Sequence, residues 1–348
     1  MIGTANGGRV SITGLGSFVP ARTLTNDELS TMVETSDQWI MERTGIRERR
    51  IAADDEALSD LCLPAARQAL ASAGVDAASI DLIIVATVTP DMAFPSTGAI
   101  IADAIGAKDA AAYDLSAGCT GFMYAVAQAY GMVAAGLSKR ALVVGGDVLS
   151  KIMDWTDRTT CVLFGDGAGA VVVEPVAEGG FLGFELGADG SGGPELYLPA
   201  GGSRLPASED TVAGGRHFVQ MNGREVFKFA TRALVSSAET LLERCGSSVE
   251  DVDVYVPHQA NVRIIEHARN KLGIPEEKTI VNVDRYGNTS SGSIPLALAD
   301  AAADGRLEHG SLVLMTGMGA GLTWGSALIE WSGFSGEAGN VKGTSNGR

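Results

Sequence analysis

The chain has 348 residues, 45% of them hydrophobic and 20% charged, which is ordinary for a soluble globular protein of one large or two average domains. Its formal net charge of −16 argues against nucleic acid or an anionic membrane surface as the main partner. No run of about 18 apolar residues predicts a membrane span, and the first ten residues do not read as a signal peptide. Four scattered cysteines favour a reducing, cytoplasmic location.

The two ends of the chain differ in composition from the region between them. Residues 1–8 are rich in glycine and are expected to be loose, and residues 333–348 turn to Gly, Ser, Asn and charge, which predicts a disordered tail. Between them, short apolar runs alternate with helical stretches, a pattern that predicts an α/β protein with largely buried sheets. The expected strands are 81–88, 111–115, 141–145, 170–174, 252–256, 279–283, 312–316 and 326–331.

Cys119 stands between the expected strand 111–115 and a stretch, 121–136, that is apolar nearly all round and predicts a buried helix. At a helix N-terminus, free N–H groups and the positive end of the helix dipole favour a thiolate. We therefore interpret Cys119 as a nucleophile. A cysteine in an apolar segment is more often a packing residue, and the other three, Cys62, Cys161 and Cys245, are interpreted in that way.

Two further segments carry the residue types that a cysteine nucleophile needs. His258 follows the expected strand 252–256 in Val256-Pro257-His258-Gln259-Ala260-Asn261, and Asn288 lies in Gly287-Asn288-Thr289-Ser290. Cys, His and Asn on three loops at strand ends predict a nucleophilic acyl-transfer site. The alternatives are a histidine satisfied at a strand end and an asparagine that serves a turn or a helix N-cap.

A weak internal repeat divides the chain into halves at residues 9–178 and 179–332. Residues 81–85 resemble 251–255, and Cys119 aligns with Asn288 at a nearly constant offset of about 170 residues. The triplets 167–169 and 319–321 match at a shorter offset, which predicts an insertion near residues 150–165 that contains Trp155 and Arg158. The repeat predicts that Cys119 and Asn288 begin equivalent helices.

Beyond these three residues, the chain resembles the thiolase-like condensing enzymes, most closely the β-ketoacyl-acyl-carrier-protein synthase III family, over roughly residues 9–332. The resemblance implies a duplicated five-layer αβαβα sandwich. It rests on several independent segments: 35–39, 43–46, 93–96, 117–119, 156–158, 164–169, 258–261, 287–290 and 323–325.

The resemblance also implies an activity. The family joins an acyl-CoA primer to malonyl-acyl-carrier protein by decarboxylative condensation, initiating fatty-acid synthesis without a cofactor or metal. Cys119 would carry the acyl group, and His258 and Asn288 would assist decarboxylation. The backbone N–H groups of Cys119 and Ala320 would form the oxyanion hole, because each oxyanion of such a reaction needs fixed donors.

Further roles come from the resemblance alone. Coenzyme A would be bound by Thr35, Trp39, Arg43, Arg158 and Asn261, with Trp39 and Arg158 on either side of the adenine ring. In a homodimer, Phe94 would close the partner's acyl pocket, beside Met318, which stands where a Phe is expected and leaves the preferred primer open. The acidic carrier protein would dock on Lys228, Arg263, Arg269 and Lys271.

Three other functions stay open at this point. The chain could be a related acyltransferase or condensing enzyme of secondary metabolism. Cys, His and Asn also serve cysteine hydrolases, and a non-enzymatic acyl-binding protein would keep its function without His258 and Asn288. The basic residues at 263–271 could equally be a solvated helix face, and Trp39 could be a core residue.

Overall fold

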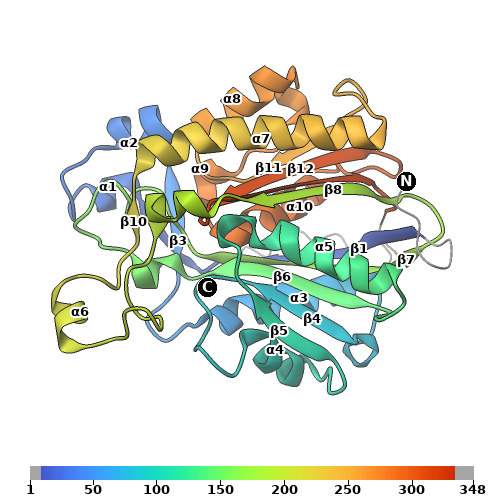
Figure 1. The fold of residues 1–348 in the computed structure, drawn as a ribbon, viewed down its shortest axis with the longest axis horizontal. Helices are drawn as coiled ribbons and strands as arrows, with labels where there is room; N and C mark the ends of the chain where they lie inside the picture. Colours follow the sequence, from blue (N-terminus) through green and yellow to red (C-terminus); the bar gives the residue numbers. More distant parts are fainter. Residues whose placement is uncertain (1–8, 334–348) are drawn as a thin grey trace, which may run out of the picture.

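The protein is described here by a computed structural model that covers residues 9–333, so both expected loose ends lie outside the described residues apart from Gly333. Figure 1 shows two β-sheets stacked face to face, with one pair of helices between them and one pair on each outer side. This order of layers is the five-layer αβαβα sandwich, and the expected fold class is confirmed.

The first sheet has five strands and comes from the N-terminal half. All five residues of β4 are buried, as expected for a short apolar strand covered by helices on both faces. β4 pairs in parallel with β5 and β6, whereas β7 runs antiparallel to β1 and β6. The spatial order is β1 (Arg9–Phe18), β7 (Gly167–Val176), β6 (Ala141–Asp147), β4 (Leu82–Ala86) and β5 (Ala111–Leu115).

The second sheet has four strands, in the order β11 (Val254–Pro257), β12 (Leu312–Gly319), β13 (Thr323–Glu330) and β8 (Gly180–Ala188). β11 and β12 are parallel, and the other two pairings are antiparallel. The parallel strands of both sheets point their carboxyl ends toward the same region. Ligand sites of α/β proteins lie at such strand ends.

Helices cover both faces of each sheet. The largest hydrophobic cluster lies between the sheets and contains residues of α5 and α10 together with strands of both halves. Gly16 allows α3 to approach β1, because a Cβ at this position would lie 2.1 Å from the carbonyl oxygen of Ala65. The outer pairs are α3 (Leu58–Ala73) with α4 (Thr97–Ile105) and α7 (Gly223–Cys245) with α8 (Val262–Leu272); the central pair is α5 (Gly121–Ala134) with α10 (Ser293–Ala303).

Smaller elements surround the strand ends. One group packs around Leu24, Ile40 and Val283, and the other forms a protruding lobe around α6. The first group comprises β2 (Arg22–Thr25), α1 (Asn26–Leu29), α2 (Asp37–Thr44), β3 (Glu48–Ile51) and α9 (Val283–Tyr286). The second comprises β9 (Leu196–Tyr197), α6 (Glu209–Ala213) and β10 (Gln220–Met221).

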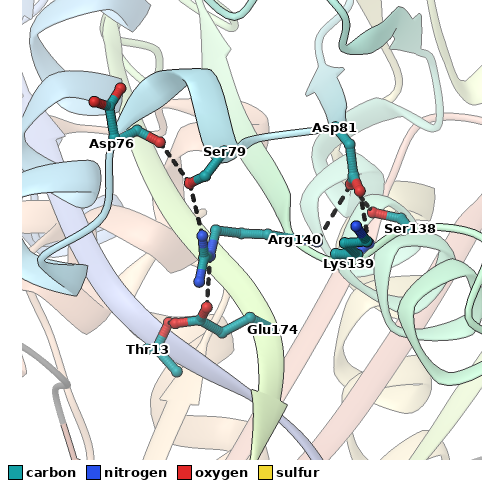
Figure 2. A network of polar contacts seen from close by, with 8 residues as sticks. All are labelled: Thr13, Asp76, Ser79, Asp81, Ser138, Lys139, Arg140 and Glu174. Atoms are coloured by element: carbon teal, nitrogen blue, oxygen red, sulfur yellow. Dashed lines mark hydrogen bonds and ion pairs between the residues drawn. The ribbon is translucent and has the colours of Figure 1, made fainter.

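A polar network fastens the amino-terminal ends of β4 and β6 (Figure 2). The Arg140 side chain pairs with Glu174 at 2.5 Å and donates to the Ser79 hydroxyl, and Glu174 also accepts from Thr13 at 2.7 Å. Asp81, just before β4, accepts the backbone N–H groups of the 139–140 turn. Glu174 is largely buried, so the pairing offsets the cost of removing its charge from water.

Two expectations from the sequence, one about a strand and one about the repeat, are wrong. Residues 279–283 are not a strand: after one bridge between Thr279 and Tyr255, the Gln259 side chain accepts the N–H groups of Asn282 and Val283 and ends the pairing. The triplets 167–169 and 319–321 are not equivalent either, because the first begins β7 and the second ends β12. The β6–β7 connection spans residues 148–166, against 320–322 between β12 and β13.

The central helix α5 also differs from the expectation. Most of its residues are buried, but Gln128 and Gly131 are exposed in the single chain. Within residues 9–333, the helices are all too short or too polar to cross a membrane.

Candidate active site

Residues from both halves line one cavity of about 240 Å³ at the carboxyl ends of the strands. Its buried part holds Cys119, His258 and Asn288, and its exposed part holds Arg43, Arg158 and Arg263 together with Trp39 and Asn261. The wall between them is apolar and consists of Val162, Leu163, Phe164, Leu196, Met221, Val226, Phe227, Phe229, Ala260, Ile264 and Met318. An apolar cavity with a few convergent polar groups is the usual form of a small-molecule site.

Cys119 lies in a 3₁₀ turn, Gly118–Thr120, that leads directly into α5. Gly118 has φ of +58°, a conformation that glycine adopts readily. A Cβ at Gly319, at the end of β12, would lie 2.5 Å from the Cys119 nitrogen. Both glycines are therefore needed for the second half to approach the cysteine backbone this closely.

The Cys119 thiol is protonated in this environment, opposite to the thiolate expected from its position before a helix. Burial raises the pKa of the thiol to about 11; the Ser290 hydroxyl beside it acts in the opposite direction, and the negative charge of Asp147 adds to the increase. Loss of hydration thus outweighs the helix terminus at this site.

The second expected oxyanion-hole donor, the backbone N–H of Ala320, lies next to the cysteine turn. A Cβ at Gly118 would be 2.6 Å from the Ala320 nitrogen. Thr323 holds the two segments together, because its hydroxyl is 2.9 Å from the Ala117 carbonyl oxygen and 3.0 Å from that of Ala320. The turn after β12 and the turn before α5 thus form one unit.

His258 follows β11 and is 1% exposed, and its backbone N–H donates to the Thr316 carbonyl at 2.7 Å. Burial lowers the pKa of the imidazole to about 3, so the ring is neutral near pH 7. Neither ring nitrogen has a hydrogen-bond partner among the described residues. A neutral ring with one N–H and no protein acceptor is suited to donate to a ligand.

Asn288 is fixed by its backbone and by its side-chain oxygen. Its N–H donates to the Leu163 carbonyl at 2.8 Å, and its own carbonyl accepts from Gly165 at 3.0 Å. The side-chain Oδ1 accepts the N–H of Ser290 at 2.8 Å, a residue with φ of +51°. Because Oδ1 is occupied by a donor, the Nδ2 hydrogens are the part of the amide left for a ligand.

At the exposed part of the cavity, Trp39 is flanked by two guanidinium groups. The Arg43 carbon Cζ lies 4.5 Å from the Trp39 ring centroid, and that of Arg158 lies 5.4 Å away. Arg158 also donates to the Glu34 carbonyl at 3.0 Å. Asn261 is the N-cap of α8 and joins it to α2 through a 3.0 Å hydrogen bond to the Arg43 carbonyl.

Several expected site residues lie apart from the cavity wall. Thr35 precedes α2 and has a buried hydroxyl without a partner among the described residues. Phe94 is 85% exposed in the single chain. Lys228 and Lys271 are exposed on α7 and α8, whereas Arg269 is paired with Glu276 at 3.2 Å and is mostly buried, so its charge is less available.

Sequence reasoning did not single out Ser290 and Asp147, which act on the pKa of Cys119, nor the neighbouring Ser291, and of the apolar wall it named Met318 alone. Ser290 and Ser291 follow the Asn288 motif directly, and their proximity in sequence was an available signal. Asp147 is a carboxylate at the end of an apolar strand, which is uncommon enough to notice. The wall comes from segments far apart in the chain, and no local pattern marks it.

Comparisons with known proteins agree with the resemblance found in the sequence. A model of 3-oxoacyl-[acyl-carrier-protein] synthase III matches residues 113–190, and a model of the C-terminal part of the same family matches residues 242–331. The β-ketoacyl-[acyl-carrier-protein] synthase III of Symbiobacterium thermophilum is 57% identical over 323 residues, which cover 92% of this chain and 98% of the relative.

Two solved structures are also close. The synthase III of Thermus thermophilus is 48% identical with a TM-score of 0.86, covering 92% of this chain and 99% of that one. The priming β-ketosynthase of the R1128 polyketide pathway is 38% identical with a TM-score of 0.86, covering 92% and 96%. The identity over almost the whole length decides against a cysteine hydrolase. This chain belongs to the 3-oxoacyl-[acyl-carrier-protein] synthase III family of condensing enzymes.

Proposed function

We propose that this chain condenses an acyl-CoA primer with malonyl-acyl-carrier protein in fatty-acid synthesis, using Cys119, His258 and Asn288. The observation that carries the assignment of these residues is that all three line the buried part of one cavity, although they come from different halves of the chain. The proposed cycle uses only side chains and backbone N–H groups of this chain and requires no cofactor.

In the first step the sulfur of Cys119 attacks the thioester carbon of acyl-CoA. The carbonyl oxygen becomes an oxyanion, for which the N–H groups of Cys119 and Ala320 are the donors. When the adduct collapses, the bond between the carbonyl carbon and the CoA sulfur breaks. The thiol proton of Cys119 ends on the CoA sulfur, so that acyl-enzyme and free coenzyme A are formed.

In the second step malonyl-carrier protein loses CO₂, and the bonding electrons form a thioester enolate. The N–H of the neutral His258 ring and the Nδ2 group of Asn288 would donate to the enolate oxygen, which is supported by the neutral imidazole and by an amide whose Oδ1 is already occupied. The enolate carbon then forms a bond to the acyl carbon, the bond to the Cys119 sulfur breaks, and the released thiolate takes up a proton.

Coenzyme A would enter past Trp39, with Arg43 meeting a phosphate and Thr35 and Asn261 serving the rest of the molecule. A flat heterocycle between Trp39 and Arg158 needs two van der Waals contacts of about 3.5 Å each. The observed separation of 5.4 Å is shorter than their sum. Arg158 would therefore move outward when the adenine ring binds, releasing its hydrogen bond to Glu34.

For the acidic carrier protein, we propose Arg263 and Lys228 as the main docking residues. Arg263 lies at the exposed part of the cavity with its guanidinium 5.6 Å from the Phe227 ring centroid, and Lys228 is exposed on α7 with an ion pair to Glu225 at 2.6 Å. Lys271 adds charge farther along α8. Surface charges of this kind increase the association rate more than the affinity.

A homodimer would complete the acyl pocket. Phe94, Met92 and Val88 lie exposed after β4, and Tyr113 lies exposed on the edge strand β5. Exposed edge strands and apolar patches mark protein interfaces. Phe94 would reach the partner's pocket, where the buried Met318 packs with Leu322. We place the protein in the cytoplasm, where its four free thiols would stay reduced.

The test is intact-mass spectrometry after mixing the chain with acyl-CoAs of different length and branching. We expect a mass gain of one acyl group, absent from Cys119→Ala. Adding malonyl-carrier protein should then give a β-ketoacyl product and regenerate the unmodified chain. An adduct that persists in Cys119→Ala would contradict the assignment of the nucleophile.

A further inference from the structure

Asp147, the last residue of β6, is a fully buried carboxylate that the proposed cycle does not use. One carboxylate oxygen accepts from the hydroxyls of Thr87 and Thr89 at 2.8 and 2.9 Å and from the N–H groups of Val88 and Thr89 at 2.8 and 3.1 Å. The other oxygen accepts from Ser291, through its hydroxyl at 2.8 Å and its N–H at 3.3 Å.

This carboxylate has no ion-pair partner within residues 9–333. A buried charge without a counter-ion is costly, and hydrogen bonds must compensate for it. Glu174 shows the contrast, because it is also buried but pairs with Arg140 (Figure 2). An apolar or amide residue would be the simpler choice at Asp147 if only packing mattered.

The donors of Asp147 come from different halves of the chain. The Thr87–Thr89 segment follows β4 in the N-terminal half, whereas Ser291 belongs to the 3₁₀ turn that leads into α10 and begins two residues after Asn288. The halves approach closely here, since a Cβ at Gly145 would lie 2.3 Å from the Ser291 carbonyl oxygen. Asp147 is thus a polar link between the Asn288 turn and the sheet of the half that carries Cys119.

We infer that Asp147 is a positioning residue, which holds the Asn288 turn against the Cys119 half so that the Asn288 amide is aligned for decarboxylation. The inference rests on the proposed function of this site. It assigns Asp147 to the second step of the cycle and not to the first, because the acyl transfer uses the backbone N–H groups of Cys119 and Ala320, which Thr323 holds independently.

The charge of Asp147 has an opposite effect on Cys119. It raises the pKa of the thiol, in addition to the effect of burial, and so disfavours the attacking thiolate. His258, on the same cavity, is neutral and adds no charge. Removing the charge should therefore ease attack by Cys119 while it disturbs Asn288, and the two half-reactions should respond in different directions.

The experiment measures both half-reactions separately in Asp147→Asn. Acylation of Cys119 is followed by mass with the acyl-CoA that loads the wild type fastest, and decarboxylation is followed as CO₂ release from malonyl-carrier protein. In this variant the amide NH₂ would face the Ser291 N–H, a contact between two donors. We expect decarboxylation to fall about 10- to 100-fold, as for a misplacement of about 1 Å, and acylation to be unchanged or faster.

Alkylation of Cys119 by iodoacetamide adds a readout that a purely structural role would not move. The pH at which the alkylation rate reaches half of its maximum should fall in Asp147→Asn, because this variant loses the negative charge. It should be unchanged in Ser291→Ala, which keeps the charge of Asp147 but loses the hydroxyl contact. Asp147 also acts on the Cys62 thiol and the Asp166 carboxyl, so the adduct is located by peptide mass. Ser291→Ala should slow decarboxylation without slowing acylation. If Asp147→Asn does not fold, this variant tests the inference in its place.

The control is Glu174→Gln, which changes another buried carboxylate (Figure 2). Glu174 pairs with Arg140 just before β6, whereas Asp147 is the last residue of that strand. The control variant should lower stability and leave the ratio of the two half-reactions unchanged. An equal fall of both half-reactions in Asp147→Asn, or decarboxylation at the wild-type rate in both variants, would overturn the inference. A wild type that performs neither half-reaction would instead overturn the proposed function, and the inference with it.

Discussion

The two halves of the molecule place different chemistry at the same point of a repeated fold. In the N-terminal half a 3₁₀ turn before α5 carries Cys119, and in the C-terminal half a similar turn before α10 follows Asn288. The central helices lie between the two sheets, so both turns reach one cavity (Figure 1). Duplication thus brought two equivalent positions together, and in the proposed cycle one carries the nucleophile and the other a hydrogen-bond donor.

The outer edges of the halves differ as well. β5 pairs over five residues with β4 and leaves an exposed edge, whereas its counterpart in the C-terminal half makes one bridge and is then fastened by Gln259. An exposed edge can pair with another chain and a fastened one cannot. The comparison therefore also explains why we expect the dimer interface on the N-terminal half.

The variant Asn288→Ala should distinguish the chemical contributions of the two halves most clearly. The variant loses the amide that we propose donates to the enolate, so decarboxylation should fall about 10²–10³-fold. Acylation of Cys119 should remain within a few-fold of the wild type, because its donors are backbone groups. Stopped reactions analysed by intact mass would show acyl-enzyme accumulating. A variant that fails to acylate would contradict the division of labour.

A second change acts on the contact between the halves. In Gly319→Ala the new Cβ would lie 2.5 Å from the Cys119 nitrogen, so one segment must shift and the proposed oxyanion hole would open. We expect acylation to fall about 10²-fold. The matched control is Gly131→Ala, because nothing lies within 4 Å of the new Cβ. This control should acylate at the wild-type rate. Gly106→Ala would not serve, because φ at Gly106 is +85° and alanine there would be strained.

A third change releases the fastened edge of the C-terminal half. Gln259→Leu leaves the N–H groups of Asn282 and Val283 and the carbonyls of Pro257 and Ile280 without the amide. We expect about 2–4 kcal/mol of stability to be lost, since each buried unsatisfied group costs about 1–3 kcal/mol. Urea unfolding would measure the loss. The exposed Gln38→Leu should change stability by less than about 0.5 kcal/mol, and equal effects of both variants would refute the role of Gln259.

Gln259 also explains why one strand expected from the sequence does not form. The expected strands at β4, β5, β6, β7, β11, β12 and β13 were confirmed in type and place, because buried strands carry continuous apolar runs. Residues 279–283 are also rich in β-branched side chains and yet form no strand, since the Gln259 side chain, 23 and 24 residues earlier, occupies the N–H groups of Asn282 and Val283. Tertiary hydrogen bonds of this kind leave no local pattern.

The site was predictable to a similar extent. Cys119, His258 and Asn288 could be named because each stands at the end of an expected strand or the start of an expected helix, and the structure brings them to one cavity. The charge states of these residues could not be predicted from the sequence. The helix start suggested a thiolate at Cys119, but the pKa depends on how completely both halves bury the thiol, which only the packed structure defines.

The burial of Cys119 and His258 leads to the smallest predicted effect, which concerns how the alkylation rate of Cys119 depends on pH. We expect no thiolate–imidazolium ion pair between these two residues. The pKa of Cys119 is raised to about 11 and that of His258 is lowered to about 3, so both groups are uncharged between these values. A thiolate–imidazolium pair would give a plateau of alkylation between two low inflections. We expect instead that the rate of Cys119 alkylation rises steadily from pH 5 to 9, and that His258→Ala leaves the shape of this profile unchanged. A plateau that disappears in His258→Ala would show that the halves form an ion pair after all, and that burial does not set the charge of the site.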